Sequence, residues 1–181
     1  MNTGKVAMCV ALAAVFFEAL SAAKSDDVTV QNPPFALTLP AGYGPFTKQV
    51  QKVASPDGEI ETTNWVSKAP TGEALVVTMS RMPAKILDPQ KLFAGARESL
   101  LKTLGATLES ETARPGDAAS IRLLFHSERA FFRARFTVEV DRFYQLLYVG
   151  RSAGQRDAAA VGSLFQSFRM NSPATATSPP A

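Results

Sequence analysis

The chain is poor in the residues from which reactive sites are usually built. Its 181 residues include one cysteine, Cys9, and one histidine, His126. One cysteine excludes an internal disulfide framework, and a zinc site normally needs three or four His, Cys or carboxylate ligands. No D-x-D-x-D-G calcium loop is present, and Gly42-Tyr43-Gly44 lacks the third glycine of a dinucleotide-binding loop. The sequence therefore predicts no metal site and no cofactor.

Charge is scarce as well, because only 19% of the residues are charged and the formal net charge is +3. Nucleic-acid-binding domains usually carry a much denser basic face, so we expect no nucleic-acid partner. A mild positive charge instead favours a protein or an acidic component of the cell envelope as the partner.

The first residues have the composition of a secretory signal peptide. Lys5 supplies the positive charge, residues 6–17 form an uncharged apolar run, and Ser21-Ala22-Ala23 offers small residues for a signal peptidase. We expect residues 1–23 to be cleaved after Ala23, which leaves a periplasmic or secreted protein without cysteine. Retention as a membrane anchor stays open, although Glu18 interrupts the run before the roughly 20 apolar residues that cross a bilayer.

The remaining chain is predicted to form one domain. Residues 24–33 are polar and read as a flexible lead-in, and residues 171–181 form a disordered tail rich in Pro, Ala and Thr. Between them, residues 34–170 contain strand patterns separated by short turns, then a helix, further strands and a last helix. Such short spacing favours antiparallel hairpins, and the element order predicts an α+β fold, an antiparallel β-sheet flanked by helices.

The expected elements follow from periodicity and turn signals. The strands are predicted at 35–39, 46–53, 59–67, 74–82, 106–112, 119–126, 130–140 and 143–149, and the helices at 88–104 and 155–168.

The helix at 88–104 has signals at both ends. Asp88 is a good N-cap, Pro89 suits the first helical position, and Gly105 follows the last turn. Leu87 and Leu92 are spaced to form a hydrophobic staple across the N-terminus. The apolar face of this helix is expected to cover the sheet.

Three segments carry a family resemblance. They are residues 35–40 (Phe-Ala-Leu-Thr-Leu-Pro), 141–149 (Asp-Arg-Phe-Tyr-Gln-Leu-Leu-Tyr-Val) and 164–169 (Leu-Phe-Gln-Ser-Phe-Arg). Together with the mid-chain helix, they resemble the PsbP-like proteins and their bacterial DcrB-like relatives over about residues 34–170.

The resemblance implies an α/β/α sandwich and a non-catalytic role. Members of that superfamily are accessory and binding modules: one type attaches to photosystem II, one binds a small GTPase in nuclear import, and many bacterial ones are exported. No functional residue carries over, because the matching positions are core and turn positions. The chain also lacks the lipobox of many bacterial relatives.

One motif points to catalysis. Gly150-Arg151-Ser152-Ala153-Gly154 matches the G-x-S-x-G nucleophile elbow of α/β-hydrolases. In that fold a histidine follows the serine, but His126 precedes Ser152 and lies in a predicted strand. We therefore interpret Ser152 as a helix cap and His126 as a solvated or hydrogen-bonded side chain.

A basic patch is the predicted binding site. Arg133 and Arg135 project from one side of the strand at 130–140, and Arg122 lies on the strand before it. If these strands are neighbours, their guanidinium groups would hold carboxylate or phosphate through paired hydrogen bonds. A solvated face balanced by Glu128, Glu139 and Asp141 is the alternative.

An aromatic contact surface is a further alternative, because Trp65, Phe131, Tyr144 and Tyr148 belong to types that are enriched at interfaces. Buried strand positions would explain the same residues.

The leading hypothesis is an exported, non-catalytic binding or accessory module of the bacterial cell envelope, not an enzyme. The alternatives are a small serine hydrolase using Ser152 and a small-ligand or lipid carrier, which would need an apolar cavity between sheet and helix.

Overall fold

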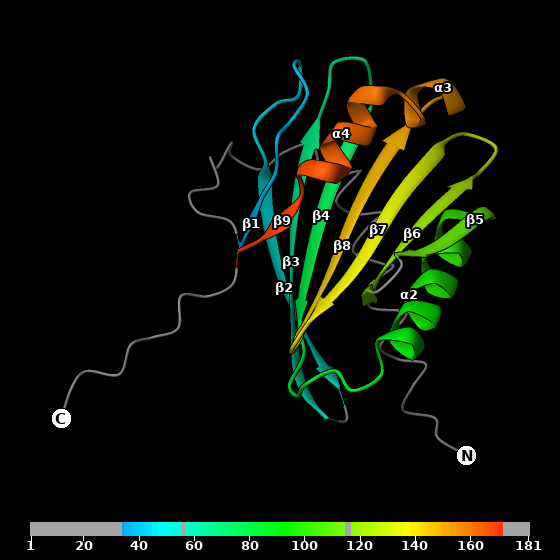
Figure 1. The fold of residues 1–181 in the computed structure, drawn as a ribbon. Coiled ribbons are helices and arrows are strands. Elements are labelled where there is room, and N and C mark those ends of the chain that lie inside the picture. The colour runs from blue at the N-terminus through cyan, green and yellow to red at the C-terminus, as the bar shows by residue number, and fades with distance from the viewer. Residues whose placement is uncertain (1–33, 56, 115–116, 172–181) are drawn as a thin grey trace.

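The computed structural model describes residues 34–55, 57–114 and 117–171, and a long antiparallel sheet organises them (Figure 1). The predicted signal peptide (1–23), the lead-in (24–33) and the tail beyond residue 171 lie outside the described residues. Within the described part of the chain, no helix is long and apolar enough to cross a membrane.

The main sheet has seven strands in the order β2-β3-β4-β8-β7-β6-β5. Their bounds are β2 (Thr47–Ser55), β3 (Gly58–Lys68), β4 (Ala74–Arg81), β5 (Thr107–Arg114), β6 (Asp117–His126), β7 (Phe131–Glu139) and β8 (Arg142–Gly150). Every neighbouring pair is antiparallel. The predicted fold class, an antiparallel sheet flanked by helices, is confirmed.

Alternating side chains give the sheet two faces, each with its own core. On β7, Phe132, Ala134 and Phe136 point to one face and pack in a cluster with helix α2 (Pro89–Leu104). The opposite face carries Trp65 and Leu146, which pack against helix α4 (Ala159–Ser167). We call these the α2 face and the α4 face (Figure 1).

Helix α2 (Pro89–Leu104) has the predicted caps. The Asp88 side chain accepts a hydrogen bond from the Lys91 backbone N–H at 3.0 Å. Gly105 has a φ of 55° and its N–H bonds to the last helical carbonyls. This left-handed conformation costs glycine little, which explains why the helix ends there.

The predicted staple between Leu87 and Leu92 is wrong, because Leu87 is 87% exposed. The preceding loop is held elsewhere: the Ile86 N–H donates to the Val140 carbonyl at 2.9 Å. Ile86 then packs against the core in the place expected for Leu87.

The predicted single helix at 155–168 is also wrong, because two helices occupy this segment on the α4 face. They are α3 (Ala153–Arg156) and α4 (Ala159–Ser167). The Asp157 N–H bonds to the Ala153 carbonyl at 2.9 Å, and Ala158 is extended at φ −56° and ψ 144°. The apolar stripe is nevertheless correct, since Val161, Leu164 and Phe165 are buried.

The two ends of the described chain pair with each other. Strand β1 (Phe35–Ala36) and strand β9 (Arg169–Met170) form an antiparallel ribbon apart from the main sheet. The strand expected at 35–39 is therefore shorter. The Thr38 N–H donates to the Ser167 hydroxyl at 3.0 Å, which takes this residue out of a backbone ladder.

Candidate functional site

Two arginines face each other directly on the α4 face. Arg122 of β6 and Arg135 of β7 are cross-strand partners, and Arg133 lies two residues along β7 on the same face. Like charges at directly opposite positions destabilise a sheet. The repulsion between the two guanidinium groups therefore disfavours this pairing. Unfavourable local arrangements of this kind are found most often at functional sites.

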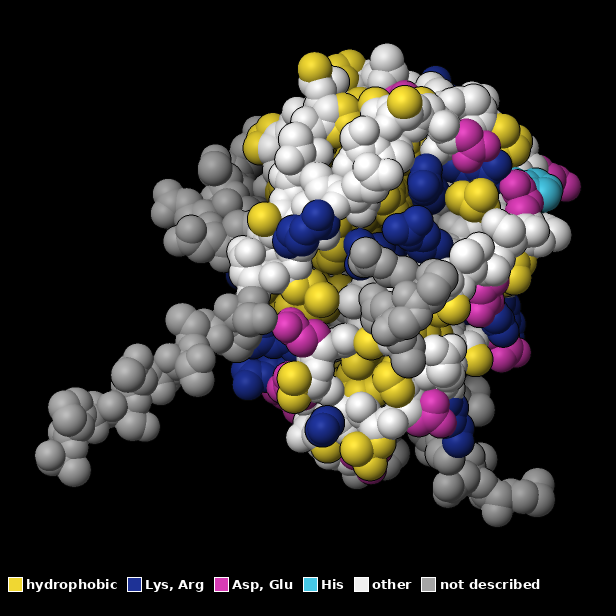
Figure 2. Space-filling view, in the orientation of Figure 1, with side chains coloured by type: hydrophobic (Ala, Val, Ile, Leu, Met, Phe, Trp, Pro, Cys, Tyr) yellow, Lys and Arg dark blue, Asp and Glu magenta, His cyan; other side chains and the backbone are white. Residues whose placement is uncertain are grey.

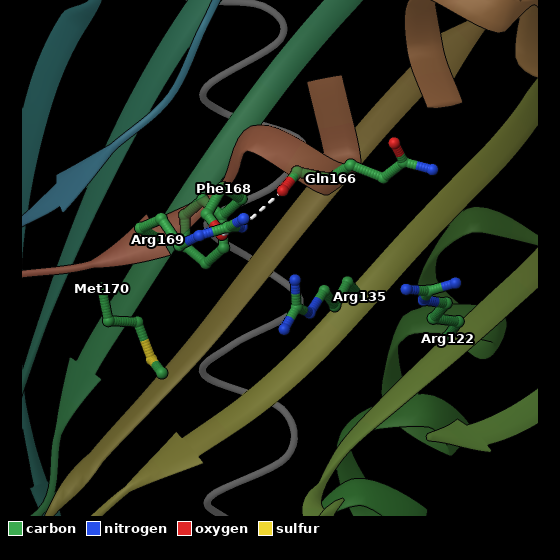
Figure 3. A pocket seen from close by; sticks show the side chains of 6 residues that line it. All are labelled: Arg122, Arg135, Gln166, Phe168, Arg169 and Met170. Carbon is green, nitrogen blue, oxygen red and sulfur yellow. Dashed lines mark hydrogen bonds between the residues drawn. The ribbon is translucent and has the colours of Figure 1, made fainter. Parts of the chain in front are cut away.

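A hollow of about 490 Å³ opens beside this pair. Figure 3 shows that its walls come from the sheet on one side and from the end of α4 and strand β9 on the other. Its lining residues are Arg122, Arg135, Gln166, Phe168, Arg169 and Met170. We call it the arginine hollow. Lys and Arg side chains gather near the middle of the same face in Figure 2.

On the wall opposite the sheet, backbone carbonyl groups hold the Arg169 side chain in place. The Arg169 Nη1 group donates to the Phe168 carbonyl at 2.9 Å and also to the Gln166 carbonyl. These bonds hold the guanidinium of Arg169 over the end of α4. Arg169, the third arginine of the hollow, is thus held in place by the C-terminal end of α4.

The sheet side is oriented by a buried hydroxyl. The Arg135 Nε group donates to the Ser120 Oγ at 3.3 Å, and Ser120 is buried. Ser120 pairs with Thr137 across the strands, so this hydroxyl lies on the α4 face next to the arginine. The contact directs the guanidinium of Arg135 along the sheet.

Arg133 lies close to the arginine hollow and is half-buried. Its guanidinium sits over the Phe165 ring at 5.1 Å from the centroid, a cation–π contact with α4. Burial lowers the pKa of Arg133, and the positive charge of Arg122 lowers it further, whereas Asp157 acts in the opposite direction. Burial is the larger cause, so the direction of the shift mainly reflects how far this side chain is withdrawn from solvent.

Three arginines at or beside the arginine hollow have no carboxylate partner in the described part of the chain. Among the described residues, Arg122, Arg133 and Arg169 form no ion pair. Asp141, expected to balance them, pairs with Arg81 instead. The charge of Asp141 is thus engaged outside the arginine hollow.

Two carboxylates, those of Asp157 and Glu109, bind the buried Arg156. Its Nη2 and Nε groups bond to the two oxygens of Asp157 at 2.9 Å each, and its Nη1 bonds to Glu109 at 2.8 Å. The other Glu109 oxygen bonds to the His126 Nδ1 at 2.9 Å. We call these four residues the Arg156 network.

The Arg156 network shifts the pKa of both acids. The hydrogen bond from Arg156 is the main cause that lowers the pKa of Asp157, and it has the same leading effect on Glu109. Both carboxylates therefore favour their charged form and bind Arg156, and neither of them lines the arginine hollow.

The structure gives Ser152 a structural role. Its hydroxyl accepts a hydrogen bond from the Gln155 N–H at 3.2 Å, which caps α3. His126 bonds to Glu109, and in the described part of the chain no hydrogen bond joins His126 to Ser152. The elbow motif thus lacks the contact between serine and base that a nucleophile needs.

The aromatic contact surface is wrong for three of its four residues. Trp65, Tyr144 and Tyr148 are buried in the core of the α4 face. Phe131 is half-buried and stacks on His126, with ring centroids 5.9 Å apart.

Aromatic side chains also fill the space between the sheet and α2 around Phe93. The Phe93 ring lies 6.3 Å from each of the rings of Phe136 and Phe143. The carrier alternative requires an apolar cavity between sheet and helix, whereas the arginine hollow is rich in cations.

The structure brings Arg122, Arg133 and Arg135 together on one face, and their role in binding stays a prediction. Sequence reasoning missed Gln166, Phe168, Arg169 and Met170. Alternation along β6 and β7 places the first three arginines, because each strand has a regular period. No local signal places Arg169, whose position depends on β9 pairing with β1 from the other end of the chain.

The fold is similar to that of a solved PsbP protein. The solution structure of cyanobacterial PsbP (CyanoP) from Synechocystis sp. PCC 6803 matches with a TM-score of 0.49 and 15% sequence identity. The match covers 81% of this chain and 98% of that chain. No family model and no curated protein matches the sequence. The likeness concerns the fold alone, and the site rests on this chain's own residues.

Proposed function

We propose that this protein is an exported, non-catalytic module of the bacterial cell envelope that binds an anionic partner in the arginine hollow. One observation carries the proposal: arginines from three separate elements line a single hollow on the α4 face. Guanidinium groups bind carboxylate and phosphate through paired hydrogen bonds, so their convergence favours an anion.

The binding role is supported by how the neighbouring groups are used. Ser152 caps a helix, and His126 is bonded within the Arg156 network. Within the described ranges neither Arg122 nor Arg169 forms an ion pair, which supports binding of an external anion. These bonds of Ser152 and His126 support a role in the recognition of charge.

The export part of the proposal rests on the leader pattern. Sequencing of the mature N-terminus from an envelope fraction should begin at Lys24. If the protein instead starts at Met1 and remains with the membrane fraction, the leader is retained as an anchor and is not cleaved.

Site-specific crosslinking in intact cells tests binding at the arginine hollow. A photoreactive amino acid at exposed Gln166 should give a crosslinked product, and the double variant Arg122→Glu and Arg169→Glu should abolish it through charge repulsion. Its intensity should also fall as salt is raised, because exposed charge interactions are screened over about 10 Å at 0.1 M salt.

Glu98 provides the matched control position, because it is exposed on α2 at the opposite face. The same photoreactive group there should give no product that depends on Arg122 and Arg169. If the Gln166 product survives charge reversal in a folded protein, the arginine hollow is not the binding site.

A further inference from the structure

We infer that the arginine hollow binds a phosphate monoester carried on an organic group. This inference rests on the proposed anion-binding function and specifies its ligand. The argument uses the charge, the geometry and the size of the hollow.

The charge favours a dianion over a monoanion. Three arginines line the hollow and Arg133 adds a further positive charge beside it. A carboxylate contributes one negative charge, whereas a phosphate monoester carries about −1.5 to −2 at pH 7. A phosphate ester therefore neutralises more of the repulsion between Arg122 and Arg135, which their direct cross-strand pairing creates.

The geometry favours a tetrahedral group over a planar one. Arg122 and Arg135 extend from the sheet, while Arg169 approaches from β9 on the opposite wall (Figure 3). A carboxylate presents two oxygens in one plane, but a phosphate monoester presents three terminal oxygens in different directions. A phosphate can thus accept hydrogen bonds from both walls at once.

The size requires more than a phosphate. A volume of about 490 Å³ lies within the range of roughly 300–1,000 Å³ that is typical of small-molecule sites. Phe168 and Met170 supply apolar surface in the same hollow, and Gln166 supplies an amide. These residues are placed to contact the organic group that bears the phosphate.

Calorimetry with two ligands of the same shape tests the inference. Phenyl phosphate gains its second charge near pH 6, whereas phenyl sulfate stays a monoanion. At about pH 7.5, we expect the full chain to bind phenyl phosphate roughly tenfold more tightly than phenyl sulfate, the effect of one additional charged hydrogen bond. At about pH 5 the difference should nearly disappear, because the phosphate is then also close to a monoanion.

Phenyl sulfate isolates the titration of the ligand, because any titration of the protein affects the binding of both ligands. Arg122→Lys keeps the charge but loses the planar fork, so it should weaken phenyl phosphate binding severalfold. Arg169→Ala should weaken it roughly tenfold, the effect of losing one charge-assisted hydrogen bond. Arg81→Ala is the matched control, since Arg81 is exposed and pairs with Asp141 beyond the hollow.

The phosphate could belong to a soluble ester or to a lipid headgroup, and vesicles separate these sources. Phosphatidylcholine vesicles with added phosphatidic acid should retain the protein, in a manner dependent on Arg122 and Arg169, if the source is a lipid. Binding of phenyl phosphate without retention on vesicles assigns the source to a soluble ester. Both results support the phosphate class.

Equal affinity for phenyl phosphate and phenyl sulfate at both pH values would overturn the phosphate inference and leave anion binding intact. Failure to bind either ligand would also overturn it. The crosslinking experiment at Gln166 then decides separately whether the arginine hollow binds an anionic partner.

Discussion

At the scale of single residues, Arg156 shows how the fold organises its charges. Its side chain is 5% exposed and is held by Asp157 and Glu109. These two acids are more exposed, so solvent screens part of each interaction. The guanidinium ties α3 to β5, and through Glu109 it also contacts the His126 side chain of β6.

Arg156→Ala should lower the free energy of unfolding by about 2 kcal/mol, because two carboxylates lose their partner and a buried position is emptied. The loss should depend on pH. Folding lowers the pKa of Asp157 and Glu109 from their ordinary values of 3.8 and 4.5. Their contribution is therefore present above those values and is lost as the pH falls through the lower folded values.

Urea unfolding at a series of pH values measures this effect. The difference between the wild type and Arg156→Ala should be largest near neutral pH and should narrow below about pH 4. Arg129→Ala, at an exposed turn position, serves as the control and should change stability little. A difference that is constant from neutral to acid pH would show that lost packing, and not the ion pairs, causes the destabilisation.

The same scale shows what residue patterns can predict. Strand parity correctly places His126 and Arg122 on the face opposite Phe125, because a strand alternates strictly. Parity cannot reveal that Glu109 binds His126, since a register shift in β5 lies between Leu108 and Ser110. Such an irregularity has no signal in the sequence.

At the scale of elements, α2 was predictable because its ends carry local signals. Asp88, Pro89 and Gly105 act within one or two turns of the residues that they terminate. The break between α3 and α4 has no glycine or proline, since Asp157 and Ala158 occupy it. Tertiary contacts of Arg156 accompany this break, so a helical pattern alone suggested one continuous helix.

Substitution by alanine should change the stability in opposite directions at two glycines, Gly105 just after α2 and Gly162 within α4. Gly105→Ala should destabilise the protein by about 1 kcal/mol, because position 105 has a φ of 55°, which a Cβ disfavours. Gly162→Ala should stabilise it by about 0.5–1 kcal/mol, because alanine loses less conformational entropy inside a helix.

The surroundings of both glycines allow this comparison. A Cβ at Gly162 would lie 4.0 Å from the nearest Arg133 atom, and a Cβ at Gly105 would have no neighbour within 4 Å. Thermal unfolding of the two variants measures the effects under identical conditions. A loss of stability in both variants would contradict the entropic explanation for α4.

At the scale of the whole molecule, one sheet separates two cores. Phe93 of α2 is buried on the α2 face, and Trp65 is buried on the α4 face. The strands contribute side chains to both cores, so loss of one core should remove the support of the other. We therefore expect the domain to unfold as a single cooperative unit.

Phe93→Ala tests this cooperativity, because Phe93 lies on the α2 face and the fluorescent probe, Trp65, lies on the α4 face. Removal of the buried ring should destabilise the domain by about 3–5 kcal/mol. Trp65 is the single tryptophan of the chain, so its fluorescence reports the α4 face alone. In urea, the fluorescence midpoint should shift by the same amount as the midpoint of circular dichroism.

Leu87→Ala is the matched control, because its exposed side chain should change neither midpoint appreciably. If Phe93→Ala shifts the circular dichroism midpoint but leaves the Trp65 midpoint unchanged, the two faces unfold independently.

The sheet order was only partly predictable at this scale. Short turns predict the hairpins β2–β3–β4 and β5–β6–β7–β8, because neighbouring strands with short connections pair. The pairing of β4 with β8 joins these two halves, as in Ala74 opposite Val149. That contact spans the intervening helix and strands, and no local pattern specifies it.

The ribbon of β1 and β9 has a mechanical consequence. Its register joins Phe35 to Met170, and the Asn171 N–H bonds to the Pro34 carbonyl at 2.9 Å. Tension applied to both ends of the domain would load these few bonds first and peel them apart in sequence. Because Arg169 and Met170 belong to β9, a stretched domain would open one wall of the arginine hollow before the seven-stranded sheet yields.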